Sequence, residues 1–187
     1  MAEEKKRRGR RDHLNDFYRD VSGNYVYTGV CYEYTGGVRA NTALLRRLRL
    51  MAAVMAAAVL AGGCISAPGV GRCFYVLLPY AAQIGVTGSI VWAVARWQVR
   101  EYPLREYIYR ATVQALPGRC LAQAVLAGVG LAAETLYLLL SGSGGHGAAA
   151  AIYLLLQACV LVLALLTRRA VLASDWQMEK HGGLTTE

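Results

Sequence analysis

The chain has 187 residues, of which 56% are hydrophobic and 17% are charged, a composition too apolar for an ordinary water-soluble domain. Its formal net charge of +8 could indicate nucleic-acid binding, but almost all Lys and Arg residues flank the apolar runs on one side, so no nucleic-acid partner is expected. The five cysteines form no CxxC pair and the three histidines are far apart in sequence, which argues against a metal site or another cofactor.

The N-terminal segment, residues 1–16, is strongly basic, with six Lys or Arg residues between positions 5 and 11. A run of like charges repels itself and buries no apolar area, so this tail is expected to be disordered. It could bind anionic lipid, at about 1 kcal/mol per basic residue near the surface. The favoured alternative is a solvated tail that helps to keep the N-terminus in the cytoplasm.

Residues 17–40 are rich in tyrosine and contain an internal repeat, because YVYTG at Tyr25–Gly29 is followed by YEYTG at Tyr32–Gly36. Alternating aromatic and β-branched residues between glycines predict a small β-hairpin on the cytoplasmic side. An isolated hairpin is marginally stable, so it needs a partner surface. The hairpin is either a structural cap on the protein's own helices or a docking element for a protein partner. The candidate docking residues are Tyr25, Tyr27, Tyr32 and Tyr34.

Residues 41–172 contain four apolar runs, at about residues 50–67, 73–95, 120–140 and 148–166. As helices rising about 1.5 Å per residue, these runs cover or nearly cover a hydrocarbon core of about 30 Å. Among the basic residues only Arg72 falls on the far side, so the positive-inside rule predicts that both termini are cytoplasmic, including a tail at residues 173–187. The predicted fold is therefore all-α: a multi-pass protein of the plasma (inner) membrane, built as an antiparallel bundle of four transmembrane helices.

An alternative interpretation of the first run is a signal peptide with an imperfect lipoprotein cleavage site, LAGGC, at Leu60–Cys64. About 45 residues precede the run, far more than an ordinary n-region contains, and three further spans follow it. The transmembrane interpretation is therefore favoured.

The longest inner connection, residues 96–118, predicts a short amphipathic helix that begins near Pro103 and lies in the inner interface. It is either a coupling helix that contacts a soluble partner or a linker between two spans. Its apolar face would comprise Leu104, Tyr107, Ile108, Ala111 and Ala115.

The predicted spans contain a single acidic residue, Glu134, and no basic residue. An acid at bilayer depth is costly and is therefore a candidate functional group. Helical spacing predicts that polar faces of three spans meet around it. This candidate intramembrane polar cluster either binds a small polar ligand or a cation, or holds the helices together by hydrogen bonds. Its members are Gln83, Thr87, Gln123, Glu134 and Gln157.

Cys64 and Cys73 flank the predicted outer turn, on the side where disulfides form. A bridge between them would close a loop of about ten residues and contribute roughly 2–3 kcal/mol. The sequence equally allows both residues to be ordinary apolar side chains.

No grouping of acid, base and nucleophile suggests catalysis, so an enzyme is not expected. The predicted function is a non-enzymatic membrane subunit or regulator, which contacts the lipid bilayer and a membrane or cytoplasmic protein. The alternative is a small transporter or proton-coupled carrier that uses Glu134 and forms a homo-oligomer, because four helices enclose little space.

Overall fold

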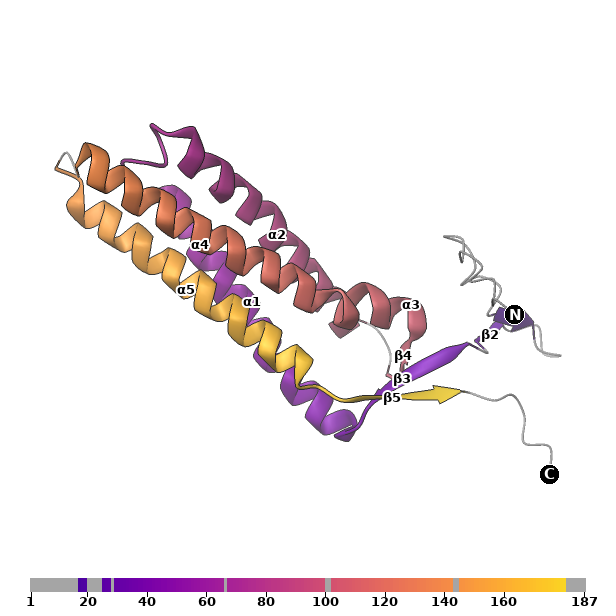
Figure 1. Ribbon diagram of the computed structural model, residues 1–187. Coiled ribbons are helices and arrows are strands. Elements are labelled where there is room, and N and C mark those ends of the chain that lie inside the picture. Colours follow the sequence, from indigo (N-terminus) through magenta and orange to yellow (C-terminus); the bar gives the residue numbers. More distant parts are fainter. Residues whose placement is uncertain are drawn as a thin grey trace, which may run out of the picture.

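Four long helices lie side by side and form an elongated helical body (Figure 1). The computed structural model describes residues 17–19, 25–27, 29–65, 67–99, 102–142 and 145–180, with the backbone alone at 17–19, 25–27, 99 and 180. The predicted N-terminal tail, residues 1–16, lies outside the described residues. α1 and α4 each pack against both α2 and α5. The bounds of the four are α1 (Gly37–Cys64), α2 (Phe74–Val99), α4 (Leu116–Ser141) and α5 (Gly147–Leu172).

Three stretches of helix are long and apolar enough to cross a membrane: Phe74–Gln98, Glu106–Ser141 and Gly147–Leu172. Their outward faces carry exposed large apolar side chains, among them Trp92 and Leu155. Helices that face water carry polar residues on that side, so these helices indicate a membrane protein. The three stretches cover all but the first residue of the predicted spans at 73–95, 120–140 and 148–166.

The first predicted span, residues 50–67, is not among these stretches. The helix that contains it, α1, begins at Gly37, whose φ of +76° favours glycine, and ends at Cys64, before the predicted boundary. The first half of α1 is rich in arginine, and the longest uncharged part of the helix is residues 50–64. This uncharged part is about 22 Å long. A fourth span through α1 therefore stays a prediction.

A three-stranded sheet lies at one end of the helical body (Figure 1). Its order is β4 (Leu104–Arg105), β3 (Val30–Tyr34), β5 (Trp176–Lys180), and both pairings are antiparallel. In this register Tyr32 lies opposite Leu104 on one side and Met178 on the other. The strands come from the segment before α1, the connection between α2 and α4, and the segment after α5. The sheet therefore joins three parts of the chain that are distant in sequence.

The two tyrosine repeats both contain strands, but they do not pair with each other as predicted. β2 (Tyr25–Tyr27) pairs with β1 (Phe17–Arg19), whereas β3 lies between β4 and β5. Two strands alone are marginally stable, and β3 gains a partner on each edge from distant segments. The predicted C-terminal tail, residues 173–187, supplies β5, and its last residues, 181–187, lie outside the described chain.

The connection before α4 is not the separate amphipathic helix that the sequence predicted. α3 (Glu106–Tyr109) and a π-helical turn, η2 (Arg110–Gln114), run directly into α4 as one helical stretch. Leu104 and Ile108 of the predicted apolar face are buried, and Arg110 of the opposite face is exposed. The buried face packs against β3 and α2, because the sheet offers it an apolar surface within the chain.

Five aromatic residues, here called the aromatic cluster, attach the sheet to the helices. The centroid of the Trp176 ring on β5 lies 5.5 Å from the ring centroids of Tyr34, Trp97 and Tyr109. Tyr32 stacks on Tyr109 with ring centroids 4.1 Å apart. Aromatic pairs at such distances contribute about 0.5–1.5 kcal/mol each beyond their burial. The cluster therefore fixes β3 and β5 to α2 and α3.

Cys31, on the central strand β3, reports on the integrity of the sheet. It is 6% exposed, and burial raises the pKa of its thiol, against a smaller lowering effect of Arg105. The thiolate is the reactive form of cysteine. Maleimide labelling of Cys31 is therefore expected to be slow at neutral pH and to accelerate only at a pH above that needed for an ordinary thiol.

Trp176→Ala is expected to destabilise the sheet by about 2–3 kcal/mol, less than for a fully buried ring because Trp176 is half-buried. Labelling of Cys31, followed by mass spectrometry, should then be about thirtyfold faster or more, because the sheet opens more often. Met178→Ala changes an exposed side chain on the same strand and should leave the rate unchanged. Equal rates in the wild type and Trp176→Ala would contradict the role of the aromatic cluster.

Candidate functional site

All five polar residues that the sequence placed inside the spans are buried in the helical body. Gln83 and Thr87 lie on α2, Gln123 and Glu134 on α4, and Gln157 on α5. They do not form one cluster. Instead they occupy three successive levels along the helices, because residues on one helix are separated by about 1.5 Å of rise each.

Gln83 and Gln157 form a reciprocal pair of amide hydrogen bonds at the middle level. Gln83 Nε2 donates to Gln157 Oε1 at 2.9 Å, and Gln157 Nε2 donates to Gln83 Oε1 at 3.2 Å. Gln157 Nε2 also donates to the hydroxyl oxygen of Tyr153 at 2.9 Å. Because α2 and α5 both pack on α1 and α4, this pair crosses the centre of the helical body.

Two tyrosines complete the middle level. The Tyr80 hydroxyl donates to the backbone oxygen of Val59 on α1 at 2.8 Å, and the ring centroids of Tyr80 and Tyr153 are 6.4 Å apart. A Cβ at Gly63 would overlap the Tyr80 hydroxyl, so the absence of a side chain there admits the ring. Neither tyrosine was predicted as a site residue. The signal for Tyr153 is its four-residue spacing from Gln157, which places both on one helix face.

Glu134 forms the level nearest the turn between α1 and α2. It has 0% exposure, and its Oε1 accepts a hydrogen bond from the backbone N–H of Gly69 at 3.3 Å. Its Oε2 is buried without a hydrogen-bond partner among the described residues. The only acid that the sequence placed inside the spans therefore holds the turn, and one of its oxygens remains available to a ligand or a proton.

Thr87 and Gln123 form the third level, on the side of the amide pair nearer the sheet. Arg119 Nη1 on α4 donates to the backbone oxygen of Ser89 on α2 at 2.9 Å, which aligns the two helices. Gln123 lies about one turn further from the sheet than Arg119, and Thr87 lies about half a turn further than Ser89. The two residues therefore differ in depth by only about 3 Å. Thr87 Oγ1 and both amide atoms of Gln123 are buried with no hydrogen-bond partner in the described chain. These three atoms would bind a water molecule or a small polar ligand.

The tyrosine candidates lie away from these levels, whereas the cysteine candidates flank the turn that Glu134 holds. The rings of Tyr32 and Tyr34 pack within the aromatic cluster, as in the structural cap considered from the sequence. Tyr25 and Tyr27 lie on β2, and their side chains are outside the described part of the structure. Cys64 is exposed and Cys73 is half-buried, and both are free thiols.

Comparison with known proteins adds no function to these residues. The chain matches no protein-family model, no curated protein and no solved structure.

The described interior contains amide, hydroxyl and carboxyl groups but no grouping suited to metal chemistry. No set of three or more His, Cys, Asp or Glu side chains in the described ranges is placed to hold a metal ion. Such an interior can bind water or a small polar ligand, and its hydrogen bonds hold helices together at about 1 kcal/mol or less each.

The contact between Gly69 and Glu134 can be tested with a double-mutant cycle. A Cβ at Gly69 would overlap Glu134 Oε2 and crowd Val76, so Gly69→Ala is expected to destabilise the protein by about 1–3 kcal/mol. In a Glu134→Ala background the same change should cost much less, because the carboxylate is absent. Thermal unfolding in detergent measures the stability of the wild type, the two single variants and the double variant.

Gly71→Ala is the matched control, since a Cβ at Gly71 would meet no atom within 4 Å. It lies in the same turn and should be nearly neutral. Additive effects of Gly69→Ala and Glu134→Ala would show that the two residues do not interact.

Proposed function

We propose that this protein is a non-enzymatic membrane subunit or regulator that docks a partner protein on its three-stranded sheet. In this proposal α1, α2, α4 and α5 each cross the plasma membrane as an antiparallel bundle, and both termini are cytoplasmic. The observation that carries the proposal is the open edge of β5, on a sheet assembled from three separate segments at one end of the helical body.

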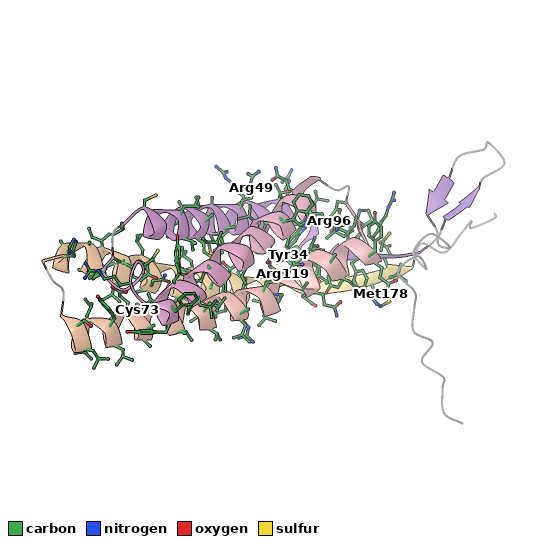
Figure 2. All side chains as sticks on the ribbon, turned by 90° about the horizontal axis from the view of Figure 1, so that it is seen from above. Tyr34, Arg49, Cys73, Arg96, Arg119 and Met178 are labelled. Atoms are coloured by element: carbon green, nitrogen blue, oxygen red, sulfur yellow. The ribbon has the colours of Figure 1, made fainter. Side chains whose placement is uncertain are left out.

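The distribution of arginine supports this topology. Arg49, Arg96 and Arg119 lie toward the end that carries the sheet, and Cys73 lies at the opposite end (Figure 2). Arg72, next to Cys73, is the only Lys or Arg of the described chain at that opposite end. Because basic residues are retained on the cytoplasmic side, the sheet end is the cytoplasmic end.

The β5 edge is suited to strand addition. Its outer side is unpaired in the described part of the chain, and Met178 at its centre is 62% exposed. The other edge, β4, has only two residues, and beside it the Tyr102 hydroxyl bonds with the backbone N–H and C=O of Tyr34. An open edge is a template on which an extended peptide adds as a further strand.

The register indicates which groups face that edge. The backbone N–H of Thr35 donates to the backbone oxygen of Asp175 at 3.1 Å. Since hydrogen-bonded pairs alternate along an antiparallel ladder, Tyr32 and Met178 form a non-hydrogen-bonded pair. The N–H and C=O groups of Met178 therefore point away from β3, toward the open edge. A proline at position 178 would remove an outward donor and leave the ladder with β3 intact.

Met178→Pro is expected to weaken retention of a stoichiometric partner at least about tenfold, because a docking hydrogen bond is lost and the ring obstructs the edge. Co-purification from native membranes in mild detergent measures this. Met178→Thr is the matched control, since threonine keeps the N–H group and favours strands. A partner retained equally by Met178→Pro, or the absence of a stoichiometric partner from every sample, would contradict the proposal.

One observation favours a second candidate, a small oligomeric transporter or proton-coupled carrier. Glu134 Oε2 is buried without a partner among the described residues, and polar levels at Gln83–Gln157 and at Thr87 and Gln123 follow it toward the sheet. A succession of hydrogen-bonding groups through the helical body could pass a proton or a small cation.

Glu134→Gln keeps the size of the side chain but removes the acid, so it is expected to abolish proton flux by a carrier of this kind. A pH-sensitive dye inside liposomes measures the flux. Thr135→Val, next to Glu134 but exposed, is the control and should retain it. Flux that survives Glu134→Gln, or wild-type vesicles without flux, would exclude the carrier.

A further inference from the structure

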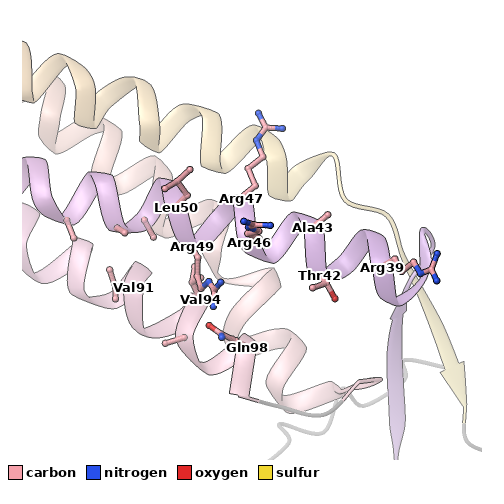
Figure 3. A pocket seen from close by; sticks show the side chains of 14 residues that line it. Arg39, Thr42, Ala43, Arg46, Arg47, Arg49, Leu50, Val91, Val94 and Gln98 are labelled. Atoms are coloured by element: carbon pink, nitrogen blue, oxygen red, sulfur yellow. The ribbon is translucent and has the colours of Figure 1, made fainter.

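A large groove lies between α1 and α2, in the half of the helical body nearer the sheet (Figure 3). Its volume is about 1110 Å³, slightly above the roughly 300–1,000 Å³ that small-molecule sites occupy. Arginines from the first half of α1 line one end. The other end is apolar and is lined by small and branched side chains, including Ala53, Ala56, Val91 and Ala95. The groove therefore has a cationic end and an apolar end.

The cationic end is not neutralised by any acidic side chain in the described part of the chain. Arg39, Arg46, Arg47 and Arg49 are all exposed, and none has an acidic ion-pair partner in the described chain. Neither α1 nor α2 contains an acidic residue. Arg46 precedes Arg49 by about one helical turn, and Arg49 extends toward Gln98 of α2 (Figure 3). Arg46 and Arg49 thus present two guanidinium groups that have no acidic partner among the described residues.

The length of α1 sets the depth of these arginines. Its uncharged part, residues 50–64, spans about 22 Å, less than a hydrocarbon core of about 30 Å. Such a mismatch is accommodated by thinning of the bilayer and by long basic side chains that reach for the headgroups. The guanidinium groups of Arg46 and Arg49 would therefore lie at the level of lipid phosphates, with the apolar end of the groove among the acyl chains.

We propose that this groove binds an anionic phospholipid of the cytoplasmic leaflet, its phosphate held by Arg46 and Arg49 and an acyl chain lying along Ala53, Ala56 and Val91. Guanidinium groups match phosphate oxygens in bidentate geometry, and basic pockets between helices on the cytoplasmic side suit such headgroups. The inference rests on the proposed placement of α1 and α2 in the membrane.

The apolar end of the groove decides between a lipid and an acidic peptide. A peptide there would carry backbone N–H and C=O groups to a depth at which no water is present to satisfy them. An acyl chain has no such groups. A lipid therefore complements both ends of the groove, whereas a peptide complements only the cationic end.

The test uses the full-length protein in phosphatidylcholine vesicles that contain phosphatidylglycerol as a minor component. The protein is extracted into detergent, and mass spectrometry measures the phosphatidylglycerol retained per protein. Two variants probe the two ends of the groove: Arg46→Gln/Arg49→Gln removes the cations, and Ala53→Phe fills the apolar end at an exposed position. Arg168→Gln/Arg169→Gln is the matched control, since it removes equal charge from α5, outside the groove.

The wild type and the α5 control should retain phosphatidylglycerol. Both groove variants should retain at least about tenfold less phosphatidylglycerol per protein than the wild type. Equal losses of phosphatidylglycerol in Arg46→Gln/Arg49→Gln and Arg168→Gln/Arg169→Gln would show that retention depends only on surface charge, and would overturn the proposal. Retention that depends on the arginines but not on Ala53 would indicate an anion alone and would also overturn it. The proposal would also be overturned if an acidic protein co-purified through Arg46 and Arg49 while the groove variants retained as much lipid as the wild type. Because Met178 is unaltered throughout, failure here leaves docking on β5 untouched.

Discussion

Two glutamine side chains, Gln83 on α2 and Gln157 on α5, hydrogen-bond to each other across the centre of the helical body. Inside an apolar body an amide without a partner is costly, so each glutamine constrains the position of the other helix. Tyr80 and Tyr153 extend the same network to α1 and across the interior. The rotation and axial position of α2 and α5 follow from these bonds. The sheet and the turn at Glu134 lie at the two ends of the arrangement that the amide pair fixes.

The helices are the part of the fold that the sequence predicts best. Each of the three apolar stretches is bounded by glycine, proline or arginine, and those local signals identify a helix without knowledge of its neighbours. The first half of α1 is ambiguous, because its arginines interrupt the apolar pattern. The sheet could not be predicted, since the partners of β3 lie about 70 and 140 residues away and nothing local in either segment identifies them.

Burial of the site residues is predictable, but their partners are not. Helical spacing turns Gln83, Gln123 and Glu134 inward, and all three are buried. Which of them meet depends on the neighbour order of the helices and on their relative heights. The hydrogen bond from Gly69 to Glu134 depends on the path of an irregular turn. The groove beside Arg46 and Arg49 depends on the packing of alanines in α1 against α2, so it too has no signature in either helix alone.

The three-stranded sheet also has a consequence for biosynthesis. β3 is made before any long helix, whereas its longer partner β5 follows the last one, and Thr35 and Asp175 are 140 residues apart. One edge of this tyrosine-rich strand therefore stays unpaired while α1, α2, α4 and α5 are synthesised. Only when the last helix has been inserted and residue 180 has left the ribosome does β5 cover it. A chain that ends before β5 keeps that edge exposed, the kind of surface that chaperones and proteases recognise, so the sheet distinguishes molecules that contain β5 from those truncated before it.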